Sequence, residues 1–339
     1  MKTRPIISYA VATYVFVLPS FLVNFLGLSP LQSFLIISIP YGGRLAGSIL
    51  FARFGHTLSL AEFYKLMLGA SASLSLLSAL LISFPAEITI RLIVGVIFGL
   101  MSSMAMYEAM EINDRKVIGG TLGGWAIGWT LAGITSMILK SWTLAISTGA
   151  LSILLLPLIS RGDMKIRKSK AGIPSPLGVL TYLLSFVPAF SLSLAPYFLE
   201  INGYSWDIVL ISYVMAIPMY FVLPALSRKI NPGVLTVIVA GIASISGVLF
   251  FDGYVYFLLP FTMAGLGLNS ITPVIARRYG INSTNSGIAI NSAALGGVVY
   301  PVIPSMMDYS DFSIIVGAST FAISSLVVDT KRKATQVTS

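Results

Sequence analysis

Long runs of apolar residues, separated by short polar connections, repeat along the whole chain of 339 residues. A helix needs about 20 mostly apolar residues to cross the roughly 30 Å hydrocarbon core of a bilayer. Cut at charges, proline and glycine, the runs give twelve candidate spans, approximately 6–27, 30–53, 62–84, 88–109, 117–139, 142–160, 175–198, 207–226, 232–250, 253–275, 285–306 and 310–328. The first run is too long for a cleaved signal peptide, so we expect it to stay in the protein. The pattern predicts an all-α integral membrane protein with twelve transmembrane helices.

The longest polar stretch follows the sixth span and divides the chain into equal halves. We expect an N-terminal six-helix bundle over 1–160, a basic linker over 161–174 and a C-terminal six-helix bundle over 175–339. Small residues recur every four positions in the fifth and eleventh spans, which are equivalent in the two halves, and they are Gly120, Gly124, Gly128, Ala289, Ala293 and Gly297. Such ladders let helices pack closely, and their equivalent placement indicates a duplicated architecture.

Composition narrows the function classes. Hydrophobic residues make up 56% of the chain and charged residues 10%, whereas a soluble domain carries about 25% charged residues. Cysteine is absent and His56 is the single histidine, so disulfides, thiolate metal sites, zinc centres and histidine-based catalytic triads are not expected. We therefore expect no enzyme, no cofactor and no metal site.

The formal charge of +9 is explained by the placement of the charges. If the N-terminus is cytoplasmic, 18 of the 21 Lys and Arg residues fall on the cytoplasmic side, and the other three are Arg44, Arg91 and Lys140. This distribution follows the positive-inside rule. It predicts a multi-pass protein of the cell membrane with both termini cytoplasmic, in contact with the lipid bilayer and not with nucleic acid. A monomer is expected.

The fourth and fifth predicted spans contain regularly spaced glycines and charged residues. In the fourth span, Gly95 and Gly99 follow Arg91 at intervals of four residues, and Glu108 and Arg115 are separated by six residues. The fifth span begins with a glycine-rich run over 119–124.

The second span contains Arg44 and Gly47, followed by Phe51. With these features, twelve spans and a six-plus-six division, the whole chain resembles the major facilitator superfamily, and the second span resembles its sugar porter and metabolite:proton symporter branches. The resemblance implies two six-helix bundles, close packing at the glycines of spans four and five, and transport of a small solute with no cofactor.

The resemblance also implies a cytoplasmic gate at the loop after span two and at the inner end of span four. The gate residues it indicates are Arg53, Gly55, His56, Glu108 and Arg115. The loop departs from the family pattern, because Ala52 or His56 occupies the position of the expected aspartate. The carboxylate of the gate salt bridge is therefore absent from this loop.

Arg44 is the only charge deep within a span, since it lies nine residues before Arg53. That separation corresponds to about 13 Å along a helix. An ionisable group at this depth is a functional candidate because its burial is costly. Two interpretations stay open: an anchor for an anionic solute, or a structural arginine satisfied by backbone carbonyls.

Polar and aromatic residues complete the predicted binding site. Trp125 and Trp129 share a helix face and could stack on a solute, and asparagines in the bilayer need hydrogen-bond partners or a wet cavity. The substrate-binding candidates are Asn24, Tyr41, Arg44, Trp125, Trp129, Asn269 and Asn291. Bending in the C-terminal half is predicted by the prolines of spans seven, eight and eleven, which are Pro188, Pro196, Pro218, Pro224, Pro301 and Pro304.

The function predicted from these features is secondary transport of a small organic solute, such as a metabolite, sugar or organic anion, by alternating access. A multidrug-type efflux carrier is the first alternative. A membrane-embedded enzyme of lipid metabolism and a non-transporting sensor are alternatives of other classes. All Asp and Glu residues fall in loops or at span ends, so the sequence does not support proton coupling.

Overall fold

The computed structural model describes residues 2–159, 166, 172–205, 207–299 and 307–336. All regular elements in these ranges are helices, without a strand. The N-terminal half contains α1 (Arg4–Val17), η1 (Leu18–Phe21), η2 (Val23–Leu26), α2 (Pro30–Phe54), η3 (Gly55–Thr57), α3 (Leu60–Leu80), α4 (Phe84–Ile112), α5 (Arg115–Leu139), α6 (Trp142–Ser147), η4 (Thr148–Leu155) and α7 (Leu156–Ile159).

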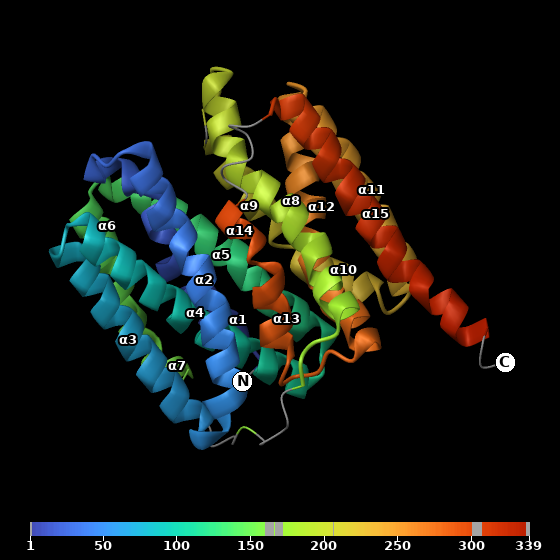
Figure 1. Ribbon diagram of the computed structural model, residues 1–339, viewed down its shortest axis with the longest axis horizontal. Helices are drawn as coiled ribbons and strands as arrows, with labels where there is room; N and C mark the ends of the chain where they lie inside the picture. The colour runs from blue at the N-terminus through green and yellow to red at the C-terminus, as the bar shows by residue number, and fades with distance from the viewer. Residues whose placement is uncertain (1, 160–165, 167–171, 206, 300–306, 337–339) are drawn as a thin grey trace.

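The C-terminal half contains α8 (Pro176–Ile201), α9 (Asp207–Ala216), α10 (Met219–Leu226), α11 (Pro232–Phe251), η5 (Val255–Phe257), α12 (Leu258–Ala276), η6 (Arg277–Tyr279), α13 (Ser286–Ala293), α14 (Gly296–Val299) and α15 (Tyr309–Gln336). Figure 1 shows the blue-to-green helices of the N-terminal half beside the yellow-to-red helices of the C-terminal half. Helices α13 and α14 lie where the two halves meet and contact α2 of the N-terminal half.

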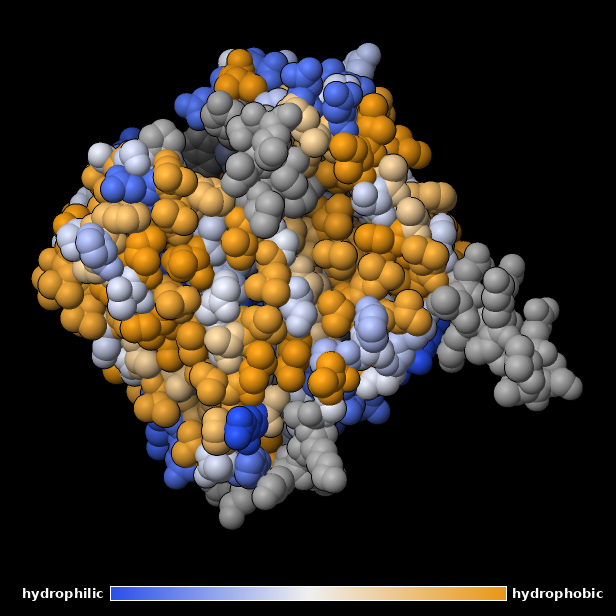
Figure 2. Space-filling view, in the orientation of Figure 1, coloured by the Kyte–Doolittle hydropathy of each residue, from blue (hydrophilic) through white to orange (hydrophobic). Residues whose placement is uncertain are grey.

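Eleven helices in the described ranges are long and apolar enough to cross a membrane. The remaining predicted span, 285–306, begins with the shorter apolar helix Ser286–Val298, and residues 300–306 lie outside the described part of the chain. Apolar side chains cover the middle of the face shown in Figure 2, and hydrophilic side chains gather above and below it. The chain is therefore a multi-pass membrane protein built from helices, as the apolar runs predict.

Local sequence explains where several helices begin. Ser29 and Gln32 form a reciprocal capping box at the start of α2, and Ser59 and Glu62 form another at the start of α3. The carboxylate of Asp114 accepts a hydrogen bond from a backbone N–H in the first turn of α5. Each cap satisfies backbone donors that the first helical turn leaves unpaired.

Glycines bring two helix pairs of the N-terminal half into backbone contact. A methyl group at Gly99 of α4 would overlap the carbonyl oxygen of Arg44 in α2, and one at Gly95 would overlap that of Pro40. In α5, a methyl group at Gly124 would lie 2.8 Å from the backbone nitrogen of Ala10 in α1. Without a side chain, these positions allow the close approach that small residues give membrane helices.

The other members of the predicted packing set contact side chains or backbone in the same way. A methyl group at Gly120 would lie 2.7 Å from the ring of Phe221 in α10, and one at Gly297 would lie 2.7 Å from the ring of Tyr41. Gly128 faces the carbonyl oxygen of Ala10. The ladders of spans five and eleven therefore meet helices of both halves.

Two predicted spans of the C-terminal half are interrupted. The eighth span is divided into α9 and α10 around Pro218, and α13 and α14 are separated by Ala294 and Leu295. Proline has no backbone N–H and disrupts the helical hydrogen-bond ladder. The break at Pro218 agrees with the predicted bending, whereas α8 continues through Pro188 and Pro196, and Pro301 and Pro304 lie outside the described residues.

Candidate solute cavity and the closed end

A cavity of about 450 Å³ lies between the two halves. Its walls come from α1, η1, η2, α2 and α5 of the N-terminal half and from α8, α9, α12 and α14 of the C-terminal half. Residues that line it are Tyr9, Val17, Ser20, Phe21, Val23, Asn24, Ile37, Tyr41, Leu122, Trp125, Trp129, Phe186, Ala189, Phe190, Ser193, Leu194, Pro196, Glu200, Tyr213, Asn269 and Gly297. The exposed members of the lining are Asn24, Ser193 and Glu200, and Asn24 and Glu200 mark its mouth, at the end of the molecule away from the start of α1.

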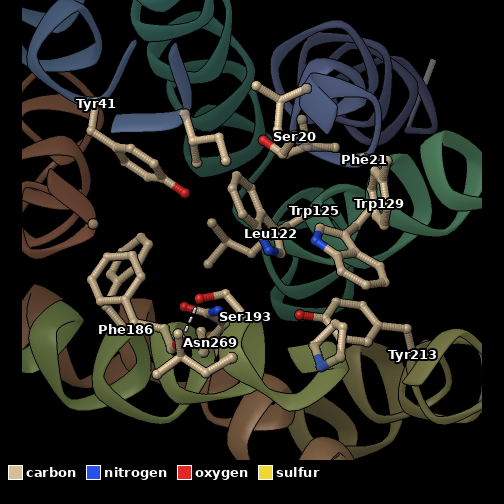
Figure 3. A pocket seen from close by; sticks show the side chains of 18 of the residues that line it. Ser20, Phe21, Tyr41, Leu122, Trp125, Trp129, Phe186, Ser193, Tyr213 and Asn269 are labelled. Atoms are coloured by element: carbon tan, nitrogen blue, oxygen red, sulfur yellow. Dashed lines mark hydrogen bonds between the residues drawn. The ribbon is translucent and has the colours of Figure 1, made fainter. Parts of the chain in front are cut away.

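Aromatic rings form much of the wall. Trp129 of α5 stacks on Tyr213 of α9, with ring centroids 4.0 Å apart and an interplanar angle of 17°. Phe21 meets Trp129 edge-on at 4.7 Å. The stack joins the two halves beside the cavity, as Figure 3 shows.

Hydroxyl, indole and amide groups supply the polar part of the cavity. In Figure 3 the Tyr41 and Ser20 hydroxyls and the indole nitrogen of Trp125 point toward one space. Asn269 approaches from α12, where its side-chain oxygen accepts a hydrogen bond from the hydroxyl of Ser185. Aromatic faces combined with a few hydrogen-bonding groups are typical of sites that bind small organic molecules.

Arg44 lies behind the cavity wall. Its side chain is fully buried, and its Nε donates a 2.8 Å hydrogen bond to Oδ1 of Asn291 in α13. Within the described residues, its Nη1 and Nη2 have no hydrogen-bond partner. Five rings surround the guanidinium carbon with centroids 4.4–5.8 Å away, and they belong to Phe16, Tyr41, Phe98, Trp125 and Phe186.

Asn291 connects the two halves at this depth. Its amide nitrogen donates to the carbonyl oxygen of Gly287 at 2.9 Å, while its oxygen accepts from Arg44. Of the seven predicted binding residues, five line the cavity: Asn24, Tyr41, Trp125, Trp129 and Asn269. Arg44 and Asn291 instead form a buried pair that does not line it.

The end of the molecule that carries the start of α1 is closed by polar contacts between the halves. On the N-terminal half, the contacts involve the connection between α4 and α5, residues 110–115. Four residues of the C-terminal half contact this connection: Ser227, Arg228, Arg277 and Ser283. We name residues 110–115 and these four residues together the latch.

Charged hydrogen bonds dominate the latch. Arg228 donates to Asp114 at 3.0 Å, and Arg277 donates to Oδ1 of Asn113 at 2.6 Å. Arg115 donates to the carbonyl oxygen of Ser227 at 2.7 Å. The backbone N–H of the second residue after Asp114, with Lys2 and Arg228 nearby, lowers the pKa of this carboxyl group, so Asp114 is ionised at neutral pH. The cavity is thus open at one end while the latch closes the other.

Only part of the predicted gate takes part in this closure. Arg115 belongs to the latch, whereas Glu108 bonds within the N-terminal half, to Arg4 at 2.6 Å and to the Tyr64 hydroxyl at 3.2 Å. In the described part of the chain, Arg53 and His56 form no hydrogen bond or ion pair with the C-terminal half. Arg53 lies over the ring of Phe54.

Gly55, the remaining gate candidate, packs against its own helix. A methyl group there would lie 2.9 Å from the ring of Phe51. Since the loop after span two has no carboxylate, it has no group to pair with a cation across the interface. Asp114 and Arg228 were not predicted as partners, although the loop that contains Arg228 is equivalent in position to the loop after span two.

No family model matches the sequence, and no curated protein matches it. By contrast, the structure is similar to that of a solved transporter, described as the major facilitator superfamily proton:xylose symporter XylE bound to 6-bromo-6-deoxy-D-glucose. The TM-score is 0.76 at 13% sequence identity, and the match covers 95% of this chain and 93% of that one. This likeness, together with the helical architecture and the cavity between the halves, shows that the chain has the major facilitator fold.

Proposed function

We propose that the protein is a secondary transporter that moves a small organic solute across the cell membrane by alternating access. The two moving bodies are residues 1–160 and 175–339, joined by the linker 161–174. The observation that carries the proposal is the cavity between the halves, open at one end and closed by the latch at the other. A carrier that alternates needs this combination of an accessible binding space and contacts that can separate.

The volume and lining of the cavity support a small solute. A space of about 450 Å³ falls within the roughly 300–1,000 Å³ usual for ligand pockets. With both termini cytoplasmic, as the charge distribution predicts, the latch lies on the cytoplasmic side and the cavity opens outward.

Pulsed electron paramagnetic resonance tests alternation without knowledge of the substrate. Because the chain has no cysteine, spin labels can be placed directly in the natural sequence. We would label exposed Phe25 and Tyr204 across the mouth, and exposed Lys65 and Arg278 across the closed end.

In lipid nanodiscs, we expect each pair to show two distance populations that change in opposite senses: the mouth shortens when the closed end lengthens. A control pair within the N-terminal half, at Leu80 and Ile138, should keep one distance. One unchanging distance for both test pairs, across ligands and pH, would contradict the proposal.

The direction of net solute movement distinguishes an uptake carrier from the efflux alternative. In proteoliposomes of known orientation, net movement of a solute toward the side of the termini indicates uptake, and the reverse movement indicates the efflux alternative.

A further inference from the structure

The guanidinium of Arg44 lies directly beneath the cavity wall. The rings of Tyr41, Trp125 and Phe186 line the cavity, and their centroids lie 5.7, 5.5 and 5.8 Å from the guanidinium carbon. Tyr9 also lines the cavity and interacts electrostatically with Arg44. A single layer of side chains therefore separates this cation from the solute space.

The charge of Arg44 has no counter-ion among the described residues. Ion pairs there engage Lys2, Arg4 and Arg228, and the hydrogen-bond partner of Arg44 is the neutral amide of Asn291. A guanidinium stays protonated in proteins, and an unpaired buried charge in a membrane is costly. Aromatic faces offset part of this cost, but Nη1 and Nη2 have no hydrogen-bond partner among the residues that the structure describes.

We propose that Arg44 is the anion-binding group of the cavity and that the transported solute is a small organic monoanion, whose carboxylate reaches Nη1 and Nη2 by displacing a ring of this layer. This inference rests on the proposed transport function. A carboxylate can accept two parallel hydrogen bonds from a guanidinium, which gives both charge and orientation. The single guanidinium of Arg44 beneath these rings matches a single negative charge, and the aromatic walls suit an apolar or aromatic body.

The position of Asn291 links binding to the interface between the halves. Nε of Arg44 already bonds to Asn291 of the C-terminal half, so a carboxylate on Nη1 and Nη2 would share one side chain with an inter-half contact. Solute binding would then change the relative stability of the open and closed arrangements. Glu200 at the mouth is a carboxylate on the same path, but it is exposed, so solvent and salt screen its repulsion.

Thermal unfolding of the full-length protein in detergent tests this assignment. The probes are benzoate, pyruvate and lactate, each compared at equal ionic strength with its neutral amide: benzamide, pyruvamide and lactamide. We expect at least one carboxylate to raise the unfolding temperature in a saturable manner, because a ligand that binds the folded state stabilises it. The matching amide should not.

Arg44→Gln should abolish the shift, while Arg53→Gln, the same change on an exposed position of the same helix, should retain it. If Arg44→Gln does not fold, Arg44→Lys serves instead. It should raise the half-saturating concentration at least about tenfold, because an ammonium keeps the charge but lacks the planar fork.

Three results would overturn the assignment: no shift with any carboxylate, equal shifts with acid and amide, or an unchanged concentration dependence in the Arg44 variant that folds. If spin-label distances alternate while only neutral probes bind, the transport proposal stands and the anion site fails. If a carboxylate binds through Arg44 while the distances never change, the anion site stands and transport fails.

Discussion

Arg4 and Glu108 form an ion pair with almost no contact with solvent. Their side chains retain 6% and 2% exposure, and the closest nitrogen–oxygen distance is 2.6 Å. Removal of one partner from a buried pair leaves the other charge uncompensated and costs about 3–5 kcal/mol in soluble proteins. We therefore expect Glu108→Gln to lower the unfolding temperature in detergent strongly.

The double variant Arg4→Met/Glu108→Leu is the informative control for this pair. It removes both charges and replaces them with apolar volume, so its loss should be smaller than that of Glu108→Gln alone. A double variant as unstable as the single one would show that packing at this site, rather than the unpaired charge, determines stability.

Gly99 allows α4 to approach the backbone of α2. A methyl group at Gly99 would overlap the carbonyl oxygen of Arg44, so Gly99→Ala must move the helices apart. Overpacking of this kind costs about 1–3 kcal/mol, which a thermal melt in detergent would detect. Gly69→Ala in α3 is the matched control, because no atom lies within 4 Å of the added methyl group. It should be neutral or stabilise by up to about 1 kcal/mol, and equal losses at both positions would contradict the close-packing argument.

At the residue scale, the sequence indicated which polar residues lie deep in the membrane better than it indicated which of them line the cavity. The predicted Asn24, Tyr41 and Asn269 line the cavity. Arg44 was selected for its depth in an apolar run, but whether a helical residue faces a cavity or a neighbouring helix depends on tertiary packing. Ser20 and Ser193 also line the cavity, and short hydroxyl side chains are too common in membrane helices to be singled out by pattern.

Among the elements, the short connection between α4 and α5 closes one end of the molecule. Asp114 accepts from Arg228 across the interface, and also caps α5. Because its pKa is lowered in the closed arrangement, its contribution is complete above the ordinary carboxyl pKa and is lost as the pH falls through the lowered value. Acidification should therefore lengthen the Lys65–Arg278 spin-label distance.

Asp114→Asn isolates the charge in this connection, since asparagine also caps helices well. An exposed ion pair contributes about 0.2–1 kcal/mol, so the variant should shift the populations a few-fold toward separation at neutral pH. Its distances should also respond less to acid than those of the natural protein. An acid response of unchanged size in Asp114→Asn would assign the sensitivity to another group.

The apolar runs predicted the elements well because a membrane requires long, internally hydrogen-bonded helices. Every predicted span coincides with a helical segment, at least over its described residues. The break between Ala294 and Leu295 was not expected. Gly296 and Gly297 follow the break directly, and a glycine pair favours a turn, but small residues are common in membrane helices, so the pair alone did not distinguish a break from close packing.

In the whole molecule, function depends on contacts that no single helix contains. The cavity draws residues from both halves, and the Trp129–Tyr213 stack and the Arg44–Asn291 bond cross between them. The sequence predicted two bundles from the six-plus-six pattern, and the structure shows the major facilitator fold. The pairing of Asp114 with Arg228 could not be predicted, because residues 114 positions apart meet only through the arrangement of the halves.

If the halves must separate at the latch for transport, a covalent bridge there should stop exchange and leave binding intact. Asn113 and Arg277 touch across the interface at 2.6 Å, and the chain has no other cysteine to react, so Asn113→Cys/Arg277→Cys can be joined by a short bismaleimide with a cleavable linker. In proteoliposomes, we expect the bridged protein to lose counterflow of whichever solute stabilises the natural protein, and cleavage of the linker to restore it. The ligand-dependent rise in unfolding temperature should persist while the bridge is intact, because the cavity remains open at its mouth. Treatment with a monofunctional maleimide is the control for modification alone, and full counterflow in completely bridged protein would mean that solute crosses without separation at this end.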